Sequence, residues 1–574
     1  MVVFKSKRQI DIPRLDILSL LYESDWCLAR EETEIHVQAA NPSNSITKAE
    51  SRKLLKRVAH VLRQRFGIGA SGPGKDVVLT VLSGSPFAPV FFYGIVAAGG
   101  IFSGASTEYR VEELTRQIED GKASLLVCSP ECEAQVVRAG EICGIPKDRI
   151  LLLDSTIPHH WKLISVADRS DLLGTSGQML DWQRLTDLPT LEDVTICLLY
   201  SSGTTGLPKG IRISHWGLVA NNVCTMDPAR RYKAISEKEG REFTFNTIAH
   251  LPMSNIAGIS LYSTNPFYMG GTAWWMEKYD FETFLECHRR YRPAYQFTVP
   301  PVWLRIAKSD KVTDHFDALQ VAVTGAAPIG QDLVKEVQKK LGRGRAHMAQ
   351  TWGTTETTGV IAATDWLAYS KDGTWSVGEL CPNVTLRVID EDGRDVPEGQ
   401  PGEMLVGGPI LAQAYHNRPE ATRESFQQGF YHTGDIGTYT NGHVRIVDRK
   451  KELIKYKGSQ VAPAELEALL ISHPRIADAA VIGLWDEAQQ TEVPRAYVVR
   501  RQSSDGDGRT ITAQEVADFV KNRVASYKQL RGGVFFVDEI PKSASGKILR
   551  KELRARIKPP PSSSSSSSSI QAKL

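Results

Sequence analysis

One stretch of the chain decides the fold: Tyr200-Ser201-Ser202-Gly203-Thr204-Thr205-Gly206-Leu207-Pro208-Lys209-Gly210. Its glycines let backbone N–H groups approach phosphate oxygens closely, its hydroxyl side chains supply further donors, and Lys209 adds a positive charge. It is not a Walker loop, because no Gly-Lys-Ser/Thr closes it and its lysine precedes a glycine. The stretch therefore predicts a phosphate-binding loop, although a flexible surface turn would have a similar composition.

The sequence around this loop alternates between strand-like and helix-like segments. Val194 to Tyr200 predicts the strand that leads into the loop. Three earlier apolar runs are typical of buried strands, and they span Val77 to Leu82, Ser124 to Cys128 and Ile150 to Leu153. The most apolar window, Phe87 to Phe102, is shorter than the roughly 18 residues of a membrane span and predicts a core helix. These segments predict layered α/β subdomains.

The second half of the chain has a different texture. Turn dipeptides such as Asp392-Gly393 and Asn441-Gly442 divide residues 376–445 into short strands, which predicts a small β-rich subdomain. Beyond a charged stretch lies an α+β segment, in which Thr512 and Glu515 form a capping box at a helix start. We expect an N-terminal domain over residues 1–447, a smaller C-terminal domain over 448–558, and a disordered Pro/Ser tail over 559–574.

Composition excludes several classes of protein. The 574 residues are 41% hydrophobic and too many for one core, so at least two domains are expected. The net charge of +3, from 69 basic and 66 acidic side chains, argues against a nucleic-acid partner. Eight scattered cysteines predict free thiols rather than disulfides or a zinc site. No apolar run follows the early basic residues, so no secretory signal is predicted.

Five further motifs follow the loop in chain order. They are Thr324-Gly325-Ala326-Ala327-Pro328, Gln350-Thr351-Trp352-Gly353-Thr354-Thr355-Glu356, Tyr431-His432-Thr433-Gly434-Asp435, Asp448 to Gly458, and Pro541 to Arg550. Each has a simple structural interpretation when it is taken alone. Lys450 to Lys457 could be a solvated helix face, Asp435 a turn residue, and Lys547 a surface lysine.

Together, the six motifs resemble those of the adenylate-forming, AMP-binding superfamily. That superfamily includes acyl-CoA synthetases, 4-coumarate:CoA ligases, peptide-synthetase adenylation domains and firefly luciferase. The resemblance extends from about residue 15 to residue 558. It implies an ATP-dependent acid:CoA ligase that makes acyl-AMP and pyrophosphate, and then acyl-CoA and AMP. ATP, coenzyme A and Mg²⁺ are the implied ligands, and the C-terminal domain is implied to be mobile.

The resemblance also implies roles for individual residues. The nucleotide-binding set is Ser201, Ser202, Gly203, Thr204, Thr205, Gly206, Lys209, Gly325, Ala326, Gln350, Trp352, Gly353, Thr355, Asp435, Arg449 and Lys547. The catalytic set is Lys547 for adenylation, Lys455 for thioester formation, Thr205 and Glu356, of which Thr205 and Glu356 are also the implied metal ligands. Lys451 is the implied hinge. Trp352 stands where tyrosine is more usual, and its larger π-face suits the same stacking on adenine.

The implied acid pocket departs from the pattern of aryl-acid ligases. Its wall residues are Asn255, Val299, Trp303 and Thr324. In the segment His250 to Gly258, Ser254 and Asn255 replace the usual aromatic and histidine, unless His250 or Asn255 takes over the histidine's role. Ala257 and Gly258 are compatible with room for a bulky acid or with helix packing.

The chain ends in Ala572-Lys573-Leu574, which resembles a Ser-Lys-Leu peroxisomal signal exposed by the Pro/Ser tail. A peroxisomal import receptor is therefore an expected partner, and a chance tripeptide is the alternative. The overall character resembles fungal 4-coumarate:CoA ligase-like enzymes, some of which act in secondary metabolism. Three other functions stay open: loading a carrier protein, a luciferase-like oxygenase, and a catalytically silent AMP-binding sensor.

Overall fold

The computed structural model describes residues 1–174, 177–201, 208–327, 329–367, 376–457, 459–487, 489–501, 510–543 and 546–556. The chain divides into two compact units, Met1–Lys451 and Glu452–Leu574. The sequence placed this division between residues 447 and 448. The strand that ends at Arg449 belongs to the first unit, so the division falls just after it.

An eight-stranded sheet with the order β20-β10-β9-β5-β4-β6-β7-β8 carries the phosphate loop. Its strands are β4 (Val77–Val81), β5 (Ile101–Ala105), β6 (Leu125–Cys128), β7 (Ile150–Asp154), β8 (Lys162–Ser165), β9 (Thr195–Ser201), β10 (Lys209–Ser214) and β20 (Ala414–Tyr415). β9, β5, β4, β6 and β7 run parallel, while β10 returns antiparallel to β9. β4 and β6 are buried along their whole length, as their unbroken apolar runs require.

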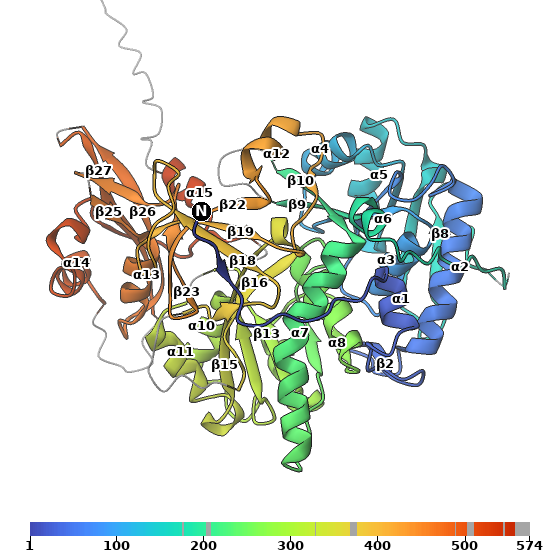
Figure 1. Cartoon of the computed structure of the whole chain (residues 1–574), viewed down its shortest axis with the longest axis horizontal. Helices are drawn as coiled ribbons and strands as arrows, with labels where there is room; N and C mark the ends of the chain where they lie inside the picture. Colours follow the sequence, from blue (N-terminus) through green and yellow to red (C-terminus); the bar gives the residue numbers. More distant parts are fainter. Residues whose placement is uncertain are drawn as a thin grey trace, which may run out of the picture. The chain divides into compact units, whose positions relative to one another are not determined.

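Helices pack around this sheet (Figure 1), and they are α1 (Ile17–Tyr22), α2 (Lys48–Phe66), α3 (Phe87–Ala97), α4 (Val111–Gly121), α5 (Glu133–Ile142) and α6 (Leu188–Asp193). Every residue of α3 is buried. A Cβ on Gly94 would lie 2.4 Å from Val58 of α2, so only glycine permits this close helix contact. The predicted helix over residues 87–102 is too long, because the chain turns at Gly99 and Gly100 and Ile101 begins β5.

An eleven-stranded sheet follows the order β1-β18-β19-β22-β23-β17-β16-β15-β14-β13, with β21 paired to β22. Its strands are β1 (Phe4–Lys5), β13 (Tyr295–Thr298), β14 (Val321–Thr324), β15 (His347–Thr354), β16 (Gly359–Ala363), β17 (Glu379–Leu380), β18 (Thr385–Ile389), β19 (Gly402–Gly407), β21 (Phe426–Gln427), β22 (Phe430–Thr440) and β23 (His443–Arg449). The β-rich region expected from the turn signals is thus hydrogen-bonded to the parallel strands β13–β15 through β16 and β17.

The first unit also contains a four-stranded sheet with the order β11-β12-β2-β3 and several further helices. They are β2 (Glu34–Gln38), β3 (Ser45–Thr47), β11 (Thr247–Ala249), β12 (Ala273–Trp275), α7 (His215–Lys238), the π-helix η3 (Gly258–Thr264), α8 (Asn265–Tyr268), α9 (Phe281–Tyr291), α10 (Pro300–Lys308), α11 (Gln331–Gln338) and α12 (Pro419–Ser425). Short 3-10 turns lie at Pro130–Cys132, Lys147–Arg149, Gly342–Gly344 and Thr355–Thr357.

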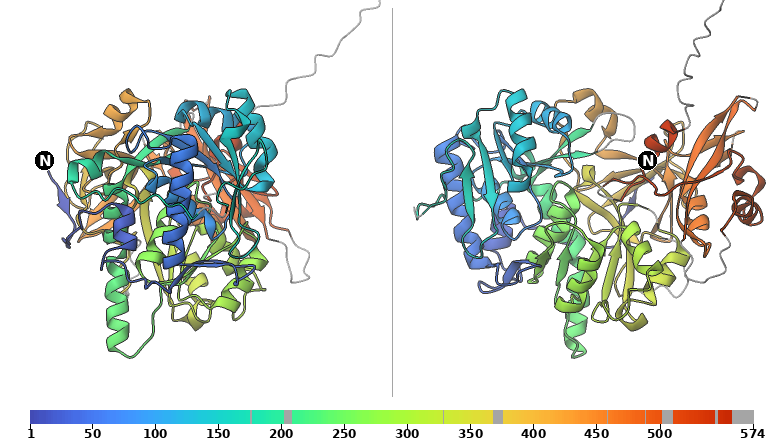
Figure 2. Two further views of the ribbon diagram at one scale, coloured as in Figure 1. Left: turned by 90° about the vertical axis from the view of Figure 1, so that its right-hand side faces the viewer. Right: turned by 180° about the vertical axis from the view of Figure 1, so that it is seen from behind.

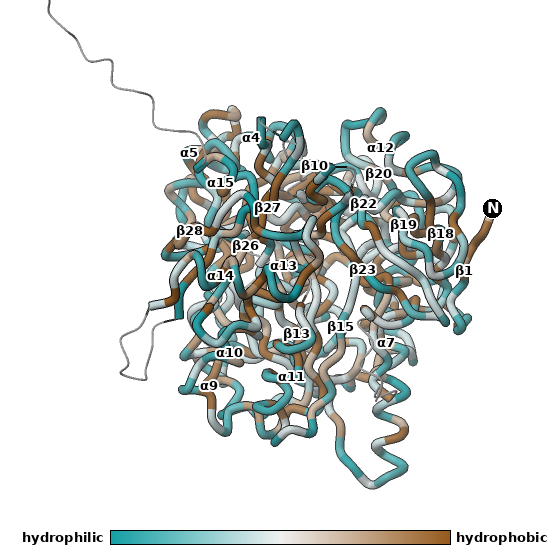
Figure 3. Tube along the Cα trace, turned by 90° about the vertical axis from the view of Figure 1, so that its left-hand side faces the viewer, coloured by the Kyte–Doolittle hydropathy of each residue, from teal (hydrophilic) through white to brown (hydrophobic). Residues whose placement is uncertain are grey.

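The long helix α7 changes environment along its length. Its first half is buried on most sides, whereas beyond Pro228 only Ala229, Tyr232 and Ser236 are buried, at the spacing of one helix face. That half extends past the neighbouring elements (Figure 2), and its trace alternates between hydrophilic and hydrophobic colours (Figure 3).

The second unit is an α+β domain built on the three-stranded sheet β26-β27-β28. Its elements are β24 (Ile454–Tyr456), β25 (Ser459–Val461), α13 (Pro463–Ile471), β26 (Ile476–Asp486), β27 (Thr491–Arg500), α14 (Ala513–Lys521), η6 (Ser526–Lys528), β28 (Val534–Phe536) and α15 (Arg550–Ala555). The predicted capping box of α14 is present, since Thr512 and Glu515 exchange hydrogen bonds. The prediction of a layered α/β region followed by a smaller α+β domain is confirmed.

All eight cysteines are free. Within the residues that the structure describes, no helix is both long and apolar enough to cross a membrane.

Candidate active site

The phosphate loop joins two strands that are paired with each other. β9 ends at Ser201, β10 begins at Lys209, and these two residues face each other across the antiparallel ladder. Residues 202–207, with the predicted site residues Ser202, Gly203, Thr204, Thr205 and Gly206, lie outside the described residues. The Lys209 ammonium lies 4.8 Å from the centre of the Tyr415 ring, a cation–π distance.

Tyr415 connects this lysine to the predicted metal ligand. Its hydroxyl donates to Glu356 Oε1 at 3.0 Å, and the Glu356 carbonyl accepts from the Ala412 N–H at 2.8 Å. Burial raises the pKa of Tyr415, and the charge of Glu356 raises it further, so the phenol stays a neutral donor. No sequence motif indicated Tyr415. It reaches the site because β20 pairs with β10, opposite Ile211.

Trp352, Asp435 and Arg449 form a second cluster. The indole Nε1 of Trp352 donates to Asp435 Oδ2 at 2.8 Å, and Arg449 Nε lies 3.3 Å from Asp435 Oδ1. Asp435 and Arg449 are register partners on β22 and β23, so Asp435 lies within a strand and the turn interpretation is wrong. Trp352 is only 7% exposed and Asp435 4%, so this charge-assisted contact is shielded from water.

The ends of the parallel strands bring together the residues that were predicted to lie beside adenine. Thr324 at the end of β14 is the register partner of Gln350 on β15, and the Thr351 hydroxyl donates to the Thr324 carbonyl at 3.1 Å. A Cβ on Gly325 would lie 2.4 Å from Thr351 Oγ1, and Ala326 has a φ of +69°. Such carboxyl-terminal edges of parallel strands are where α/β sheets bind ligands.

Gly353 and Thr355, two other predicted site residues of the motif Gln350 to Glu356, lie where the backbone conformation is constrained. A Cβ on Gly353 would lie 2.1 Å from the Gly359 carbonyl, so β15 and its antiparallel partner β16 leave no room for a side chain there. Thr355 begins the 3-10 turn Thr355–Thr357, which also carries Glu356.

The predicted acid-pocket walls lie near the same edge of the sheet. Val299 follows β13 directly, and Trp303 lies one turn into α10; both are buried. The indole nitrogen of Trp303 and the hydroxyl of Thr324 are buried and have no hydrogen-bond partner among the described residues. Asn255 is half-buried, and its carbonyl accepts from the Gly258 N–H at 3.0 Å where the π-helix begins.

His250 is a core residue rather than a substitute for the missing histidine. Its Nε2 lies 2.7 Å from Thr298 Oγ1, its Nδ1 lies 3.1 Å from the Tyr262 hydroxyl, and its ring packs on Phe284. Burial lowers the pKa of His250 to about 4, so the ring is neutral at pH 7. A Cβ on Gly258 would lie 2.3 Å from the Pro252 carbonyl, which favours helix packing over added room for an acid.

The two lysines of the second unit belong to segments on opposite faces of its sheet. Ile454 and Tyr456, on either side of Lys455, pack with Ala479 and Val481 of β26. Ile548, next to Lys547, packs with Ala480 and Ile482. Alternate residues of a strand point to opposite faces, so the two lysine segments cover different sides.

Local contacts fix both segments. The Lys455 N–H donates to Glu492 Oε2 at 2.7 Å, and its side chain is exposed. The Lys547 N–H donates to Ser543 Oγ at 3.2 Å, within a loop closed by the bridge between Lys542 and Ile548.

The hinge region is a turn followed by a strand rather than a helix. Lys451 is the last residue of the first unit, and β24 begins at Ile454, so the solvated-helix interpretation of residues 450–457 is wrong. Lys450, just before the hinge, pairs with Glu403 of β19 at 2.7 Å.

Comparisons with known proteins match both units. The AMP-binding enzyme model matches residues 25–416, and the AMP-binding enzyme C-terminal domain matches residues 465–547. A protein of Emericella nidulans that is named as an acyl-coenzyme A synthetase is 43% identical over 555 residues, which cover 96% of this chain and 97% of that protein. The 4-coumarate–CoA ligase 2 of Nicotiana tabacum is 35% identical over 493 residues, 84% of this chain and 85% of that one.

Solved structures agree with these sequence matches. The ATP-bound crystal structure of MatB from Rhodopseudomonas palustris is 26% identical, has a TM-score of 0.78, and covers 94% of this chain and 98% of its own.

Proposed function

The chain belongs to the AMP-binding enzyme family as an ATP-dependent acid:CoA ligase, and we propose that Trp352, Asp435 and Arg449 hold the nucleotide for its reaction. The observation that supports this proposal most strongly is the buried contact between the Trp352 indole and the Asp435 carboxylate. A carboxylate accepts from both hydroxyls of a ribose, and an aromatic face stacks on adenine. Arg449 then orients the carboxylate from the other side.

The reaction has two half-reactions. First, an oxygen of the acid attacks the α-phosphorus of ATP, the bond from that phosphorus to the bridging oxygen breaks, and pyrophosphate leaves. Then the sulfur of coenzyme A attacks the acyl carbon, the bond to the phosphate oxygen breaks, and AMP leaves while the thiol proton passes to solvent. The first step gathers negative charge, so fixed cations and dipoles must carry most of the catalysis.

Lys209, Tyr415 and Glu356 form the phosphate side of the site in this proposal. Glu356 offers a hard carboxylate oxygen, which suits Mg²⁺, and Tyr415 orients that carboxylate through its hydroxyl. Among the described residues no group of three or more His, Cys, Asp or Glu side chains is placed to hold a metal ion. Bound Mg²⁺ would offset charge on the triphosphate.

The two lysines of the second unit divide the half-reactions between them. Lys547 stabilises the charge of the adenylation step, and Lys455 serves thioester formation. The packing of their segments on opposite faces of one sheet supports this division, because a rotation of the unit would exchange one for the other. Losing one such charge contact typically raises the barrier of its step by about 3–4 kcal/mol.

A panel of aryl and aliphatic acids tests the function. We expect pyrophosphate release and consumption of free coenzyme A to rise in equal amounts with the correct acid. Pyrophosphate release with no use of coenzyme A would favour a carrier-protein substrate, and oxygen consumption or light would favour the oxygenase. Neither signal with any acid would favour the silent sensor.

Peroxisomal residence is the remaining part of the proposal. It is supported by the terminal Ala572-Lys573-Leu574, which lies outside the described residues. An N-terminal fluorescent fusion should colocalise with a peroxisomal marker, and deletion of these three residues should disperse it. An unchanged distribution after the deletion would contradict this address.

A further inference from the structure

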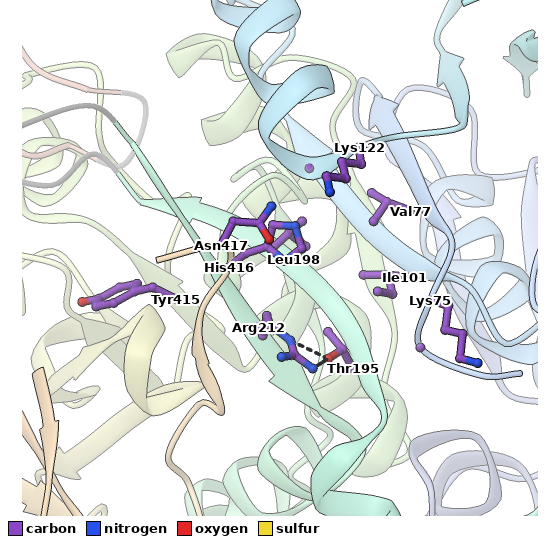
Figure 4. Close-up of a pocket in the computed structure, with 12 residues that line it drawn as sticks. Lys75, Val77, Ile101, Lys122, Thr195, Leu198, Arg212, Tyr415, His416 and Asn417 are labelled. Atoms are coloured by element: carbon purple, nitrogen blue, oxygen red, sulfur yellow. Dashed lines mark hydrogen bonds between the residues drawn. The ribbon is translucent and has the colours of Figure 1, made fainter. Parts of the chain in front are cut away.

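A pocket of about 240 Å³ lies in the first unit on the side of the eight-stranded sheet that faces the end of α4 (Figure 4). The starts of β4, β5 and β9, the middle of β10, and the end of β20 with the two residues after it form its walls, so Tyr415 borders both this pocket and the candidate active site. Within the parallel strands this is the amino-terminal edge, whereas the phosphate loop follows the carboxyl-terminal end of β9. The pocket is therefore separate from the nucleotide loop.

Three cationic side chains line this pocket: Lys75, Lys122 and Arg212. None of the three has a carboxylate within 4 Å among the residues that the structure describes. Lys75 Nζ donates to the Ser71 carbonyl, and Arg212 Nε and Nη2 donate to Thr195 Oγ1 at 3.1 and 3.0 Å. Like charges gathered without an acid repel one another, and a bound anion would relieve that repulsion.

One acid beside the lining residues is already paired. Asp120, which precedes the lining residues Gly121 and Lys122, binds Arg418 at 2.6 Å and accepts from the Tyr200 hydroxyl at 2.8 Å. Asp120 therefore has partners outside the pocket, and its charge also reaches His416, whose pKa it raises.

His416 adds a buried polar atom with no partner. Its backbone N–H donates to the Gly210 carbonyl at 2.7 Å, which fixes the residue beside β10. Its Nε2 is buried and has no hydrogen-bond partner among the described residues. Burial lowers the pKa of His416, the Asp120 charge raises it, and the Arg212, Lys122 and Arg418 charges lower it; the net shift is downward, so the ring is neutral at pH 7 and carries one N–H. A buried ring nitrogen without a hydrogen-bond partner costs free energy unless a ligand or water pairs with it, and an anion selects the tautomer in which Nε2 carries the proton.

We propose that this pocket binds a small phosphate anion, either inorganic phosphate or the pyrophosphate that the ligase releases. Arg212 and Lys122 supply the charge, and the His416 N–H completes the set of donors. Phosphate is favoured over a carboxylate because Arg212, Lys122 and His416 come from three different walls of the pocket, which suits a multiply charged ion with several acceptor oxygens.

The nucleotide site also binds phosphates, so the test must fill it first. Isothermal titration of phosphate, and separately of pyrophosphate, is made into the full chain saturated with a non-hydrolysable ATP analogue, which also fills the positions of the β- and γ-phosphates. The proposal expects saturable binding of at least one of the two ions, weakened by added salt. Tighter binding of pyrophosphate would identify the reaction product as the source, and tighter binding of phosphate the free ion.

The variants separate the pocket from general charge effects. The double variant K122Q/R212Q should bind at least about tenfold more weakly, because two charge-assisted contacts are lost. The control K53Q/R65Q removes the same charge from exposed positions on α2 and should bind like the parent. If thermal melting shows that the double variant is unfolded, K122Q alone decides, since the Lys122 side chain is exposed.

Two results would overturn the proposal. One is the absence of saturable binding in the parent chain once the analogue fills the nucleotide site. The other is an equal loss of affinity in the control and in the pocket variants, which would show that only net charge matters.

Discussion

The bond between Trp352 and Asp435 is the residue-scale feature that most distinguishes this site. A buried carboxylate that loses a donor pays an unfavourable desolvation energy, on the order of 1.5–3 kcal/mol for a charged group. Trp352→Phe keeps an aromatic face and removes the donor. We expect the KM for ATP to rise about tenfold, since 1.4 kcal/mol corresponds to a factor of ten.

Two comparisons isolate that effect. The preference for ATP over 2′-deoxy-ATP should narrow in Trp352→Phe, because Asp435 no longer holds its ribose-binding position. Trp366→Phe changes another buried tryptophan, which stacks on Tyr295 and Phe245, and should leave the preference as it was. A Trp352→Phe enzyme with unaltered ribose preference would show that the bond is only structural.

Tyr415 gives the second residue-scale prediction. Tyr415→Phe removes the hydroxyl that orients Glu356, and such outer contacts typically change metal affinity by about 10–100-fold. Binding of Mn²⁺ in the presence of an ATP analogue, followed by electron spin resonance, should weaken by at least about tenfold. The matched control is Tyr439→Phe, since Tyr439 lies near the end of β22 and makes no contact with Glu356 that would orient it. Equal Mn²⁺ affinity in the two variants would show that Tyr415 has no role in the metal site.

The residue types of the candidate site could be predicted from the sequence, whereas the contacts between its residues could not. Lys209 lies in a loop whose residue types suit phosphate, whereas Glu356 and Asp435 were predicted from the resemblance of their motifs to those of the family. Tyr415 lies in no such motif, and its role depends on the pairing of β20 with β10. His250 appeared as a candidate because burial and hydrogen bonds to Thr298 and Tyr262 are invisible in the sequence.

At the scale of elements, one ion pair joins the end of β23 to β19. Glu403 accepts from Lys450 at 2.7 Å and lies 3.5 Å from His432. These partners lower the pKa of Glu403 from 4.5 to about 2, His432 contributing most. A carboxyl whose pKa is lowered in the folded state stabilises the fold above its unfolded pKa, and this contribution is lost as pH falls toward the folded value.

Glu403→Gln should therefore lower the free energy of unfolding of the first unit by on the order of 2 kcal/mol at pH 7. Urea unfolding, followed by tryptophan fluorescence, should show the difference from the parent shrinking between pH 4.5 and about 2. Glu424→Gln, at an exposed position, should show no such dependence. A difference that stays constant over this pH range would mean that the ion pair contributes nothing.

Elements with strong local signals were predicted closely, and their long-range pairing was not. Val77 to Leu82 and Ile150 to Leu153 lie within one residue of β4 and β7, because unbroken apolar runs of this length suit strands buried on both faces. The joining of β17 to β23 in one large sheet links segments far apart in the chain. No local pattern specifies such a pair, so the β-rich region was expected to be smaller than the sheet that contains it.

At the scale of the whole molecule, the second unit carries two lysine segments on opposite faces of one sheet. In the proposed mechanism Lys547 serves adenylation and Lys455 serves thioester formation, so removing one lysine should leave the half-reaction of the other intact. Charge removal at exposed or half-buried positions should leave both units folded, which circular dichroism can verify. The hinge should matter mainly to the second step. Lys451→Pro, which restricts φ at the hinge, should therefore slow thioester formation more than adenylation.

The most direct test measures the two half-reactions separately in Lys547→Ala and Lys455→Ala. Adenylation is followed by acid-dependent exchange of labelled pyrophosphate into ATP, and thioester formation by coenzyme A consumption from supplied acyl-AMP. We predict that Lys547→Ala loses the exchange by at least about a hundredfold yet still uses acyl-AMP, and that Lys455→Ala does the reverse. Equal loss of both half-reactions in both variants would contradict the division of labour between the two lysines.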